Sequence, residues 1–277
     1  MGKKAAGWLF IGLCSLIIFC PETGTASIWN IKAFLNTCPQ NDPAYNQIRS
    51  DFTIRRNGVV VGNIPCSEPT SAMNIAQYTD ELIVLQGLRT IYYMDSGQAG
   101  HLPWTPGTLY QWMKSKIKGF NIDDAATFNS CCGTIQGGLY VTLIHSDDFN
   151  RDFDRAWKGI EGNIGLYAHE VRHLDNFPHA NCNGNLNDLN YNPAALTTFG
   201  TQWWLEKSWL NGNINVGYSC LSSIERQDMA NWHLSNANST FRSRFCNTQP
   251  PILLFPANPG GPCLASHLFL PLILKNP

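Results

Sequence analysis

The sequence predicts an α/β (α+β) fold, because segments with helical and with strand patterns alternate along the middle of the chain. Ser71–Leu88 carries apolar residues at the spacing of one helix face, and the β-branched and aromatic run Thr90–Met94 is typical of a strand. Thr105–Lys118 is a second predicted helix, with Thr105 as its N-cap, and Gly138–His145 (GLYVTLIH) is the most strand-like stretch. A chain of 277 residues is long enough to bury one sizeable core.

The N-terminus has the pattern of a secretory signal peptide. It begins with Lys3 and Lys4, continues through the apolar run Ala5–Phe19 and reaches small residues before a predicted cut after Ala26. A membrane anchor is the alternative, but the apolar run is short and Pro21 follows it closely. We therefore expect a secreted protein with no stable membrane span once the signal peptide is removed.

The next segment, 27–69, contains turns and short strands. Asn57 and Gly58 lie between the strand-like runs Phe52–Arg55 and Val59–Val61, which predicts a hairpin. The segment supplies either the first strands of the domain or a propeptide. Further on, Asp147, Asp148, Asp152 and Asp154 follow His145; a solvated acidic turn is the preferred interpretation, and a calcium site is the alternative.

Three later segments are predicted helices. The first starts near Asn163 and buries a stripe of four residues, Ile164, Tyr167, Val171 and Leu174. The second, Pro193–Leu210, carries tryptophans that are expected in the core, and the third is Ser223–Leu234 with a serine cap. The proline-rich tail 247–277 ends in the apolar segment Leu268–Leu274, which is too short to span a membrane.

Cysteine usage agrees with export. Removal of the signal peptide leaves an even set of cysteines, which predicts up to four disulfides: Cys38, Cys66, Cys131, Cys132, Cys182, Cys220, Cys246 and Cys263. The neighbours Cys131 and Cys132 are expected to pair with distant partners, since a bridge between adjacent residues is strained. No CxxC pair is present, so a metal site is expected to use histidines.

The charge balance excludes two classes of partner. Loss of Lys3, Lys4 and Glu22 changes the formal charge from −1 to −2, and no basic run stands out. Nucleic acid and anionic membrane surfaces are therefore poor candidates.

The chemistry is concentrated in HEVRHLDNFPH, residues 169–179. On a helix, His169 and His173 lie one turn apart on the same face and converge on one metal ion, with Glu170 beside them. A continuing helix would turn His179 roughly 240° around the axis, away from that ion. Asn176 tolerates a left-handed conformation and Pro178 favours extended backbone before it, so the helix is expected to end there and return His179 to the metal.

This pattern, HExxHxxNxxH, resembles the HExxHxxGxxH signature of the metzincin zinc peptidases, with Asn176 at the family's glycine. The resemblance implies a zincin-like fold: a twisted mixed sheet with a backing helix and an active-site helix, followed by a mainly helical C-terminal subdomain. It implies that His169, His173 and His179 hold one catalytic Zn²⁺, that Glu170 is the general base, and that a protein or peptide is the substrate.

The resemblance to metzincins also implies a substrate-pairing edge strand and a methionine turn. An edge strand that pairs with the substrate would correspond to Gly138–His145, for which a core strand is an equal alternative. A methionine in a tight turn beneath the metal would correspond to Met229, although its surroundings have a helical pattern. Arg172 and Asp175 are candidates for orienting the imidazoles, with solvated helix charges as the preferred alternative.

The predicted organisation is therefore a signal peptide (1–26), an N-terminal segment (27–69), a zinc peptidase-like catalytic domain (70–246) and a tail (247–277). The predicted function is that of a secreted zinc metalloendopeptidase. One alternative is a gluzincin-like peptidase, in which Glu206 replaces His179 as the third ligand. The other is a secreted, non-catalytic binding domain with a structural zinc site.

Overall fold

The computed structural model describes residues 31–67, 78–94, 101–145, 156–182, 184–214 and 221–259. Several features predicted from the sequence lie outside these ranges: the signal peptide, the four aspartates after His145, Cys220, Cys263 and the apolar segment Leu268–Leu274. Within the described ranges, none of the helices combines the length and the apolarity that a membrane span requires.

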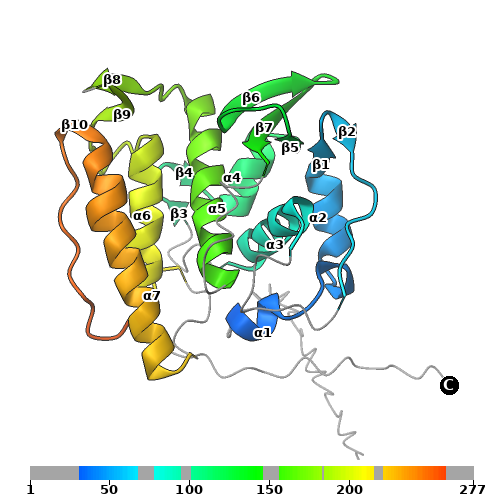
Figure 1. Ribbon diagram of the computed structural model, residues 1–277. Coiled ribbons are helices and arrows are strands. Elements are labelled where there is room, and N and C mark those ends of the chain that lie inside the picture. Colours follow the sequence, from blue (N-terminus) through cyan, green and yellow to red (C-terminus); the bar gives the residue numbers. More distant parts are fainter. Residues whose placement is uncertain are drawn as a thin grey trace, which may run out of the picture.

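A five-stranded mixed sheet forms one side of the molecule (Figure 1). Its strands, in spatial order, are β2 (Val59–Val60), β1 (Thr53–Arg56), β5 (Gly119–Asp123), β7 (Gly138–Ile144) and β6 (Ser130–Ile135). The three central strands are parallel, and the outer strands β2 and β6 run antiparallel to their neighbours. The mixed α/β character predicted from the sequence is confirmed.

Helix α5 (Ala156–Arg172) lies in the middle of the molecule, between the sheet and the later helices (Figure 1). It contacts helices on both sides, namely α1 (Ile31–Leu35), α3 (Asp80–Tyr93), α4 (Leu109–Lys116) and α6 (Thr198–Leu210). It includes Trp157 and Ile160, which are fully buried, so it begins well before the predicted start at Asn163. The segment 169–179 thus begins at the end of the central helix.

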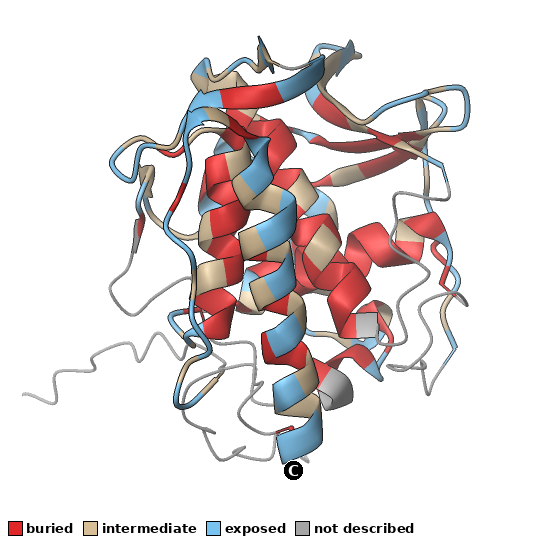
Figure 2. Cartoon of the chain, turned by 60° about the vertical axis from the view of Figure 1, so that its left-hand side comes forward, coloured by how far each residue is buried: buried red, intermediate tan, exposed pale blue. Residues whose placement is uncertain are grey.

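The core surrounds α5. Three of the four residues of the predicted stripe, Ile164, Tyr167 and Val171, are fully buried, and Leu174 is partly buried. Buried positions gather on the inner helices, whereas exposed positions lie on loops and on the outward face of the helix at the front (Figure 2). Burial of this apolar face is the main favourable term in holding α5 in place.

The predicted hairpin in the N-terminal segment is confirmed. Asn57 and Gly58 connect β1 to β2 with φ of 50° and 79°, as a two-residue turn between twisted strands requires. Strand β1 then pairs in parallel with β5, so this segment supplies two strands of the central sheet. The short helices η1 (Pro39–Asn41) and α2 (Tyr45–Asp51) precede it.

The predicted strand Thr90–Met94 is wrong, because α3 continues to Tyr93. The helix begins after its N-cap Thr79, whose side chain accepts from the Leu82 amide. The Thr90 hydroxyl donates to the Gln86 carbonyl one turn earlier at 2.8 Å, and Ile91 is buried in the core. Burial against the rest of the fold outweighs the strand preference of these residue types.

The second predicted helix begins later than expected. Thr105–Pro106 forms β4, which pairs with β3 (His101–Leu102), and Gly107 has a φ of 128° that no helix accommodates. Helix α4 starts after Thr108, which forms a capping box with Gln111. The predicted cap Thr105 is therefore wrong, and Thr108 has this role.

Gly138–His145 is confirmed as a strand, since β7 covers Gly138–Ile144. It lies between β5 and β6, however, so it is an interior strand and not the edge. Strand β6 forms the edge of the sheet that lies next to α5, and this strand was not predicted from the sequence.

The C-terminal part is mainly helical, with a small sheet at one end. Helix α6 begins at Thr198, later than predicted, and α7 (Ser223–Ser235) follows the predicted serine cap, Ser222. The chain continues through η6 (Asn236–Phe241) and η7 (Arg242–Arg244). The small sheet consists of β8 (Ala180–Cys182), β9 (Asn185–Asn190) and β10 (Phe245–Thr248). Trp203 and Trp209 are fully buried, as predicted.

The cysteines pair partly as expected. Cys38 binds Cys66, and Cys182 binds Cys246, so both pairs join distant segments. The expectation of distant partners for Cys131 and Cys132 is wrong, because these neighbours are bound to each other.

The contact between Gly119 and β1 generates a stability prediction. A Cβ at Gly119, whose φ is 149°, would lie 1.8 Å from the Thr53 carbonyl oxygen. Gly119→Ala is expected to lower the free energy of unfolding by about 3 kcal/mol or more, or to abolish cooperative unfolding in urea. Gly62→Ala is the matched control: its Cβ meets nothing within 4 Å, and the change should stay within about 0.5 kcal/mol. Equal urea midpoints for the two variants would contradict the described packing.

Candidate metal centre

The end of α5 presents two of the predicted histidines. His169 lies in the last turn of α5, and His173 begins the short 3-10 helix η4 (His173–Asp175). Asn176 then adopts the left-handed conformation, with φ 65° and ψ 39°, and its amide donates to the His173 carbonyl at 3.1 Å. The predicted helix break is therefore confirmed at the predicted residue.

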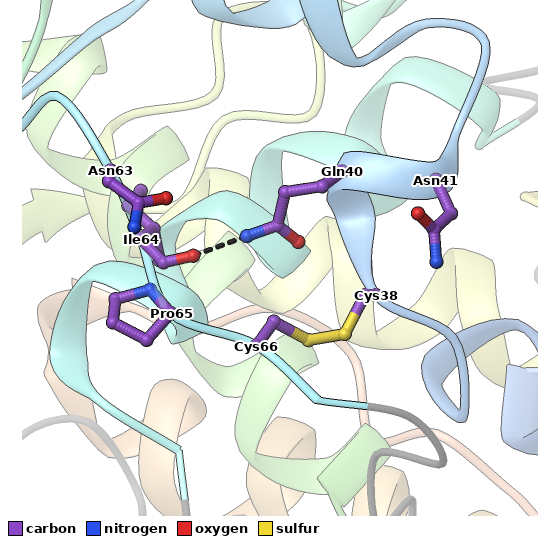
Figure 3. A pocket seen from close by; sticks show the side chains of 7 residues that line it. All are labelled: Cys38, Gln40, Asn41, Asn63, Ile64, Pro65 and Cys66. Carbon is purple, nitrogen blue, oxygen red and sulfur yellow. Dashed lines mark hydrogen bonds between the residues drawn. A yellow bond between two sulfur atoms is a disulfide. The ribbon is translucent and has the colours of Figure 1, made fainter.

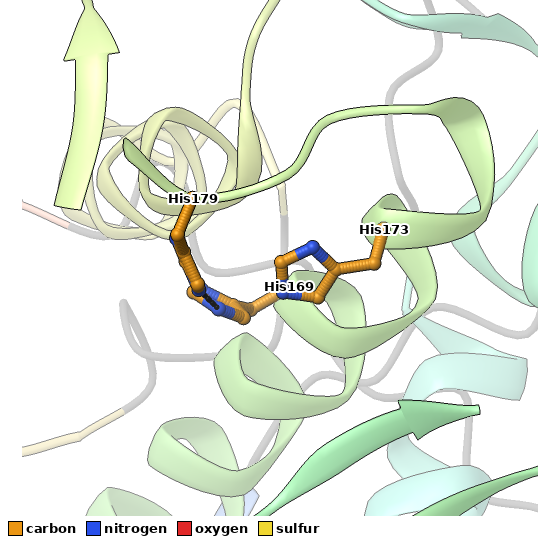
Figure 4. Close-up of side chains that lie close together, drawn as sticks. All are labelled: His169, His173 and His179. Atoms are coloured by element: carbon orange, nitrogen blue, oxygen red, sulfur yellow. Dashed lines mark hydrogen bonds between the residues drawn. The ribbon is translucent and has the colours of Figure 1, made fainter. Parts of the chain in front are cut away.

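Beyond this bend the chain returns along α5 and places His179 just before β8. The three imidazole rings, from the helix end and from the returning segment, turn toward one another (Figure 4). His169 Nε2 and His179 Nε2 are 3.1 Å apart, and one nitrogen of each ring lies within 4.8 Å of the other two. Among the described residues, these histidines form the one group of ligand side chains arranged to hold a metal ion.

The outward nitrogen Nδ1 of each ring faces an acceptor. These acceptors are Gln202 Oε1 for His169 at 2.8 Å, the Phe177 carbonyl for His173 at 2.8 Å, and Asp188 Oδ1 for His179 at 3.4 Å. Donation from Nδ1 fixes the tautomer, so the lone pair of each ring is on Nε2, on the inner side. Metal-binding histidines in proteins are oriented in this way.

Burial disfavours the charged form of two of these rings, His169 and His173. Desolvation lowers the pKa of His169 to about 3, and repulsion from His173 and His179 adds to the effect. Burial also lowers the pKa of His173. For Asp188, burial opposes ionisation, but the hydrogen bonds that it accepts from His179 and from two threonines lower its pKa. The site therefore combines two imidazoles whose pKa is lowered with one carboxylate, that of Asp188, whose pKa is lowered as well.

The arrangement fits a divalent metal ion. The Nε2 atoms of His169 and His179 are only 3.1 Å apart, and two lone pairs directed at each other at this distance are unfavourable unless a cation lies between them. Zinc–nitrogen bonds of about 2.0–2.1 Å in a tetrahedral shell separate ligand nitrogens by about 3.3 Å. The spacing of His169 and His179 is close to that value. Imidazole ligands also suit copper, iron and nickel, so the geometry alone does not select zinc.

Glu170 lies beside the histidines and is only 5% exposed. Burial raises the pKa of its carboxyl to about 7, although the backbone amide of Cys131 donates to it and opposes the shift. A carboxyl group in this position, next to the metal ligands but outside their group, is suited to exchange protons near neutral pH.

A cleft of about 710 Å³ opens onto this group. Its walls come from the segment entering β6, the bend after α5 and strand β9, and they consist of Phe128, Asn129, Ser130, Cys131, Glu170, His173, Asn176, Pro178, His179 and Leu186. Two metal-site histidines and the carboxylate thus face one space that is open to solvent.

Comparison of the chain with protein-family models, curated proteins and solved structures finds no match. The likeness to metzincins therefore depends on the residues of this chain alone.

The alternative third ligand, Glu206, is directed elsewhere. Its carboxylate accepts from His233 Nδ1 at 2.5 Å and from the Asn236 side chain at 3.2 Å, in a buried cluster that also contains Glu161. His179 occupies the place beside His169 and His173. The described geometry favours His179 over Glu206.

Other residues considered from the sequence lie away from the rings. Arg172 is buried and pairs with Asp175 at 2.6 Å, so these two neither orient an imidazole nor form solvated charges as expected. Met229 is fully buried within helix α7 and not in a turn.

A second hollow, of about 390 Å³, lies beside the Cys38–Cys66 disulfide (Figure 3). Gln40 spans it with a hydrogen bond to the Ile64 carbonyl. Its lining consists of amides, a proline, an isoleucine and the disulfide, with no histidine or carboxylate among the described lining residues. It offers no acid–base or metal chemistry.

Two residues of the site were not found from the sequence. Gln202 comes from α6, and Asp188 from β9, where it also accepts from the amides of Phe199 and Gly200 at the start of α6. Neither belongs to a motif with the histidines, and only the tertiary fold brings them together. A polar residue within a tryptophan-rich helix was the one available clue to Gln202.

The contact of His169 with Gln202 generates a prediction on metal affinity. Gln202→Ala retains a good helix former on α6 but removes the acceptor from Nδ1, so zinc affinity should fall roughly tenfold to a hundredfold. Gln227→Ala, on the exposed side of α7, is the control and should bind zinc like the native chain. Competition with a chromogenic chelator measures both affinities. Identical affinities would show that this acceptor does not orient the ring.

Proposed function

We propose that the protein is a secreted zinc-dependent metalloendopeptidase. The single observation that carries the proposal is the convergence of His169, His173 and His179 in a cleft that also contains Glu170. The divergent metzincin signature of the sequence supports the same reaction class.

Three protein ligands are typical of a catalytic site, because they leave a coordination position open. A bound zinc ion supplies Lewis acidity, which acidifies a coordinated water and polarises a carbonyl oxygen. His173 and His179 line the cleft, so the open position is accessible from the space in which a substrate would lie.

Glu170 has the acid–base role in this proposal. Its carboxylate accepts the proton that the attacking water loses and then donates it to the amine that leaves the cleaved peptide bond. Its side chain is largely buried where α5 meets β6, and this reduced contact with water strengthens its interactions with charge in the cleft.

The edge strand β6 supports a peptide as the substrate. It pairs with β7 on one side, its first residues line the cleft, and an extended peptide can add to such a strand through main-chain hydrogen bonds. In this proposal, the strand that pairs with the substrate is therefore β6 and not Gly138–His145.

Secretion is proposed on two grounds. The sequence has the pattern of a signal peptide, and disulfides within the described chain are compatible with an extracellular protein.

The competing function is a binding domain with a structural zinc site. Structural sites usually close the shell with a fourth protein ligand, whereas the group in the described chain has three members. Such a site would also have no use for a buried carboxylate beside its ligands.

Glu170→Gln distinguishes catalysis from structure. The amide cannot accept a proton, so kcat on a casein or peptide-library digest should fall roughly a hundredfold to ten-thousandfold while bound zinc is retained. Glu225→Gln is the matched control, since glutamine also serves at this capping-box position of α7. A chelator should abolish native hydrolysis, and added zinc should restore it. Hydrolysis that persists in Glu170→Gln would exclude this mechanism.

The rim of the cleft generates a prediction on specificity. Phe128 and Leu186 line it and are 69% and 62% exposed, which favours substrates with bulky apolar side chains. Phe128→Ala combined with Leu186→Ala should raise KM for apolar peptides roughly fivefold to tenfold and change kcat little. Ile224→Ala, at an 80% exposed position on α7, controls for general loss of apolar surface. An unchanged KM would remove these residues from substrate binding.

A further inference from the structure

The strand that faces Glu170 contains a local irregularity. Ser130 pairs with Thr142 and Gly133 pairs with Tyr140, so three steps along β6 match two steps along β7. Cys131 and Cys132 together therefore oppose the single residue between those partners on β7. This is the geometry of a β-bulge, which redirects backbone or side-chain groups near a site.

The bulge redirects a backbone donor toward the acid–base residue. The amide of Cys131 donates to the Glu170 carboxylate, and Cys131 lines the cleft together with Glu170 and His173. One N–H engages one carboxylate oxygen and limits rotation of the group, which leaves the other oxygen for proton transfer.

The Cys131–Cys132 disulfide joins the two positions of this bulge. Within the described residues, the other two disulfides join positions 28 and 64 residues apart, and the loops that they close restrict the unfolded chain. A disulfide at a sequence separation of 1 closes no such loop, so its contribution to global stability by this mechanism is negligible. Its effect is local: the small ring restricts the backbone dihedrals of both cysteines.

We propose that the Cys131–Cys132 disulfide is a positioning element for Glu170, because it locks the β6 bulge in the conformation that directs the Cys131 amide to the carboxylate. The inference depends on the proposed function for its catalytic consequence. The hydrogen bond itself can be tested independently of activity.

The kinetic test is the double substitution Cys131→Ser with Cys132→Ser. It should retain zinc, lower kcat roughly tenfold to a hundredfold and change KM less than about twofold, because substrate contacts remain while the acid–base group loses its orientation. Cys38→Ser with Cys66→Ser is the matched control: it removes a disulfide remote from the cleft and should lower thermal stability with kcat unchanged. Full kcat in the Cys131/Cys132 double variant would overturn the proposal.

If the disulfide acts by positioning Glu170, the loss of rate in the Cys131/Cys132 double variant should require Glu170. General damage to the site would lower the rate with or without it. In a Glu170→Ala background, the Cys131/Cys132 double substitution should reduce the residual rate no further, since the two changes act through one group. A further loss of the same size in that background would overturn the proposal.

Amide exchange gives the readout that does not need activity. By NMR, the amide at position 131 should exchange slowly in the native chain and roughly tenfold faster in Glu170→Ala, and also in the Cys131/Cys132 double variant. If the native chain binds zinc but cleaves no peptide, the proposed function fails, and this measurement still tests the positioning. Exchange at position 131 that does not respond to either change would overturn it.

Discussion

The site depends on one backbone conformation, the left-handed turn at Asn176. It ends the helical path after His173 and brings His179 back over His169, whereas a continuing helix would carry that ring to the far side. Asparagine accepts this conformation at modest cost, and its amide closes the last turn on the His173 carbonyl. Three ligand nitrogens from eleven consecutive residues converge because one residue reverses the chain.

The second requirement is that the rings remain oriented inside the protein. Some of the residues that orient them also hold the fold together. Asp188 faces His179 and also accepts from the Phe199 amide at 2.8 Å, so one carboxylate both anchors the start of α6 and orients a ring. Helix α6 in turn carries Gln202 to His169. The position of α6 is therefore coupled to the geometry of the metal ligands, which is the usual way in which outer partners tune such a site.

Features that depend on neighbouring residues could be predicted from the sequence, whereas features that depend on distant contacts could not. The break at Asn176, the hairpin at Asn57 and the serine cap of α7 depend on a few neighbouring residues, and all three were predicted correctly. The continuation of α3 through Thr90 was missed because distant packing decides it. The pairing of Cys131 with Cys132 is an exception, and it was missed because adjacent cysteines were expected to have distant partners.

The Cys182–Cys246 disulfide has a consequence for the lifetime of the protein. It joins β8, which directly follows His179, to β10 near the end of the described chain. A backbone cut anywhere between these two cysteines leaves the two fragments covalently connected. A nick in this stretch would thus leave the C-terminal helices attached to the rest of the molecule, and the damage would become visible only on reduction.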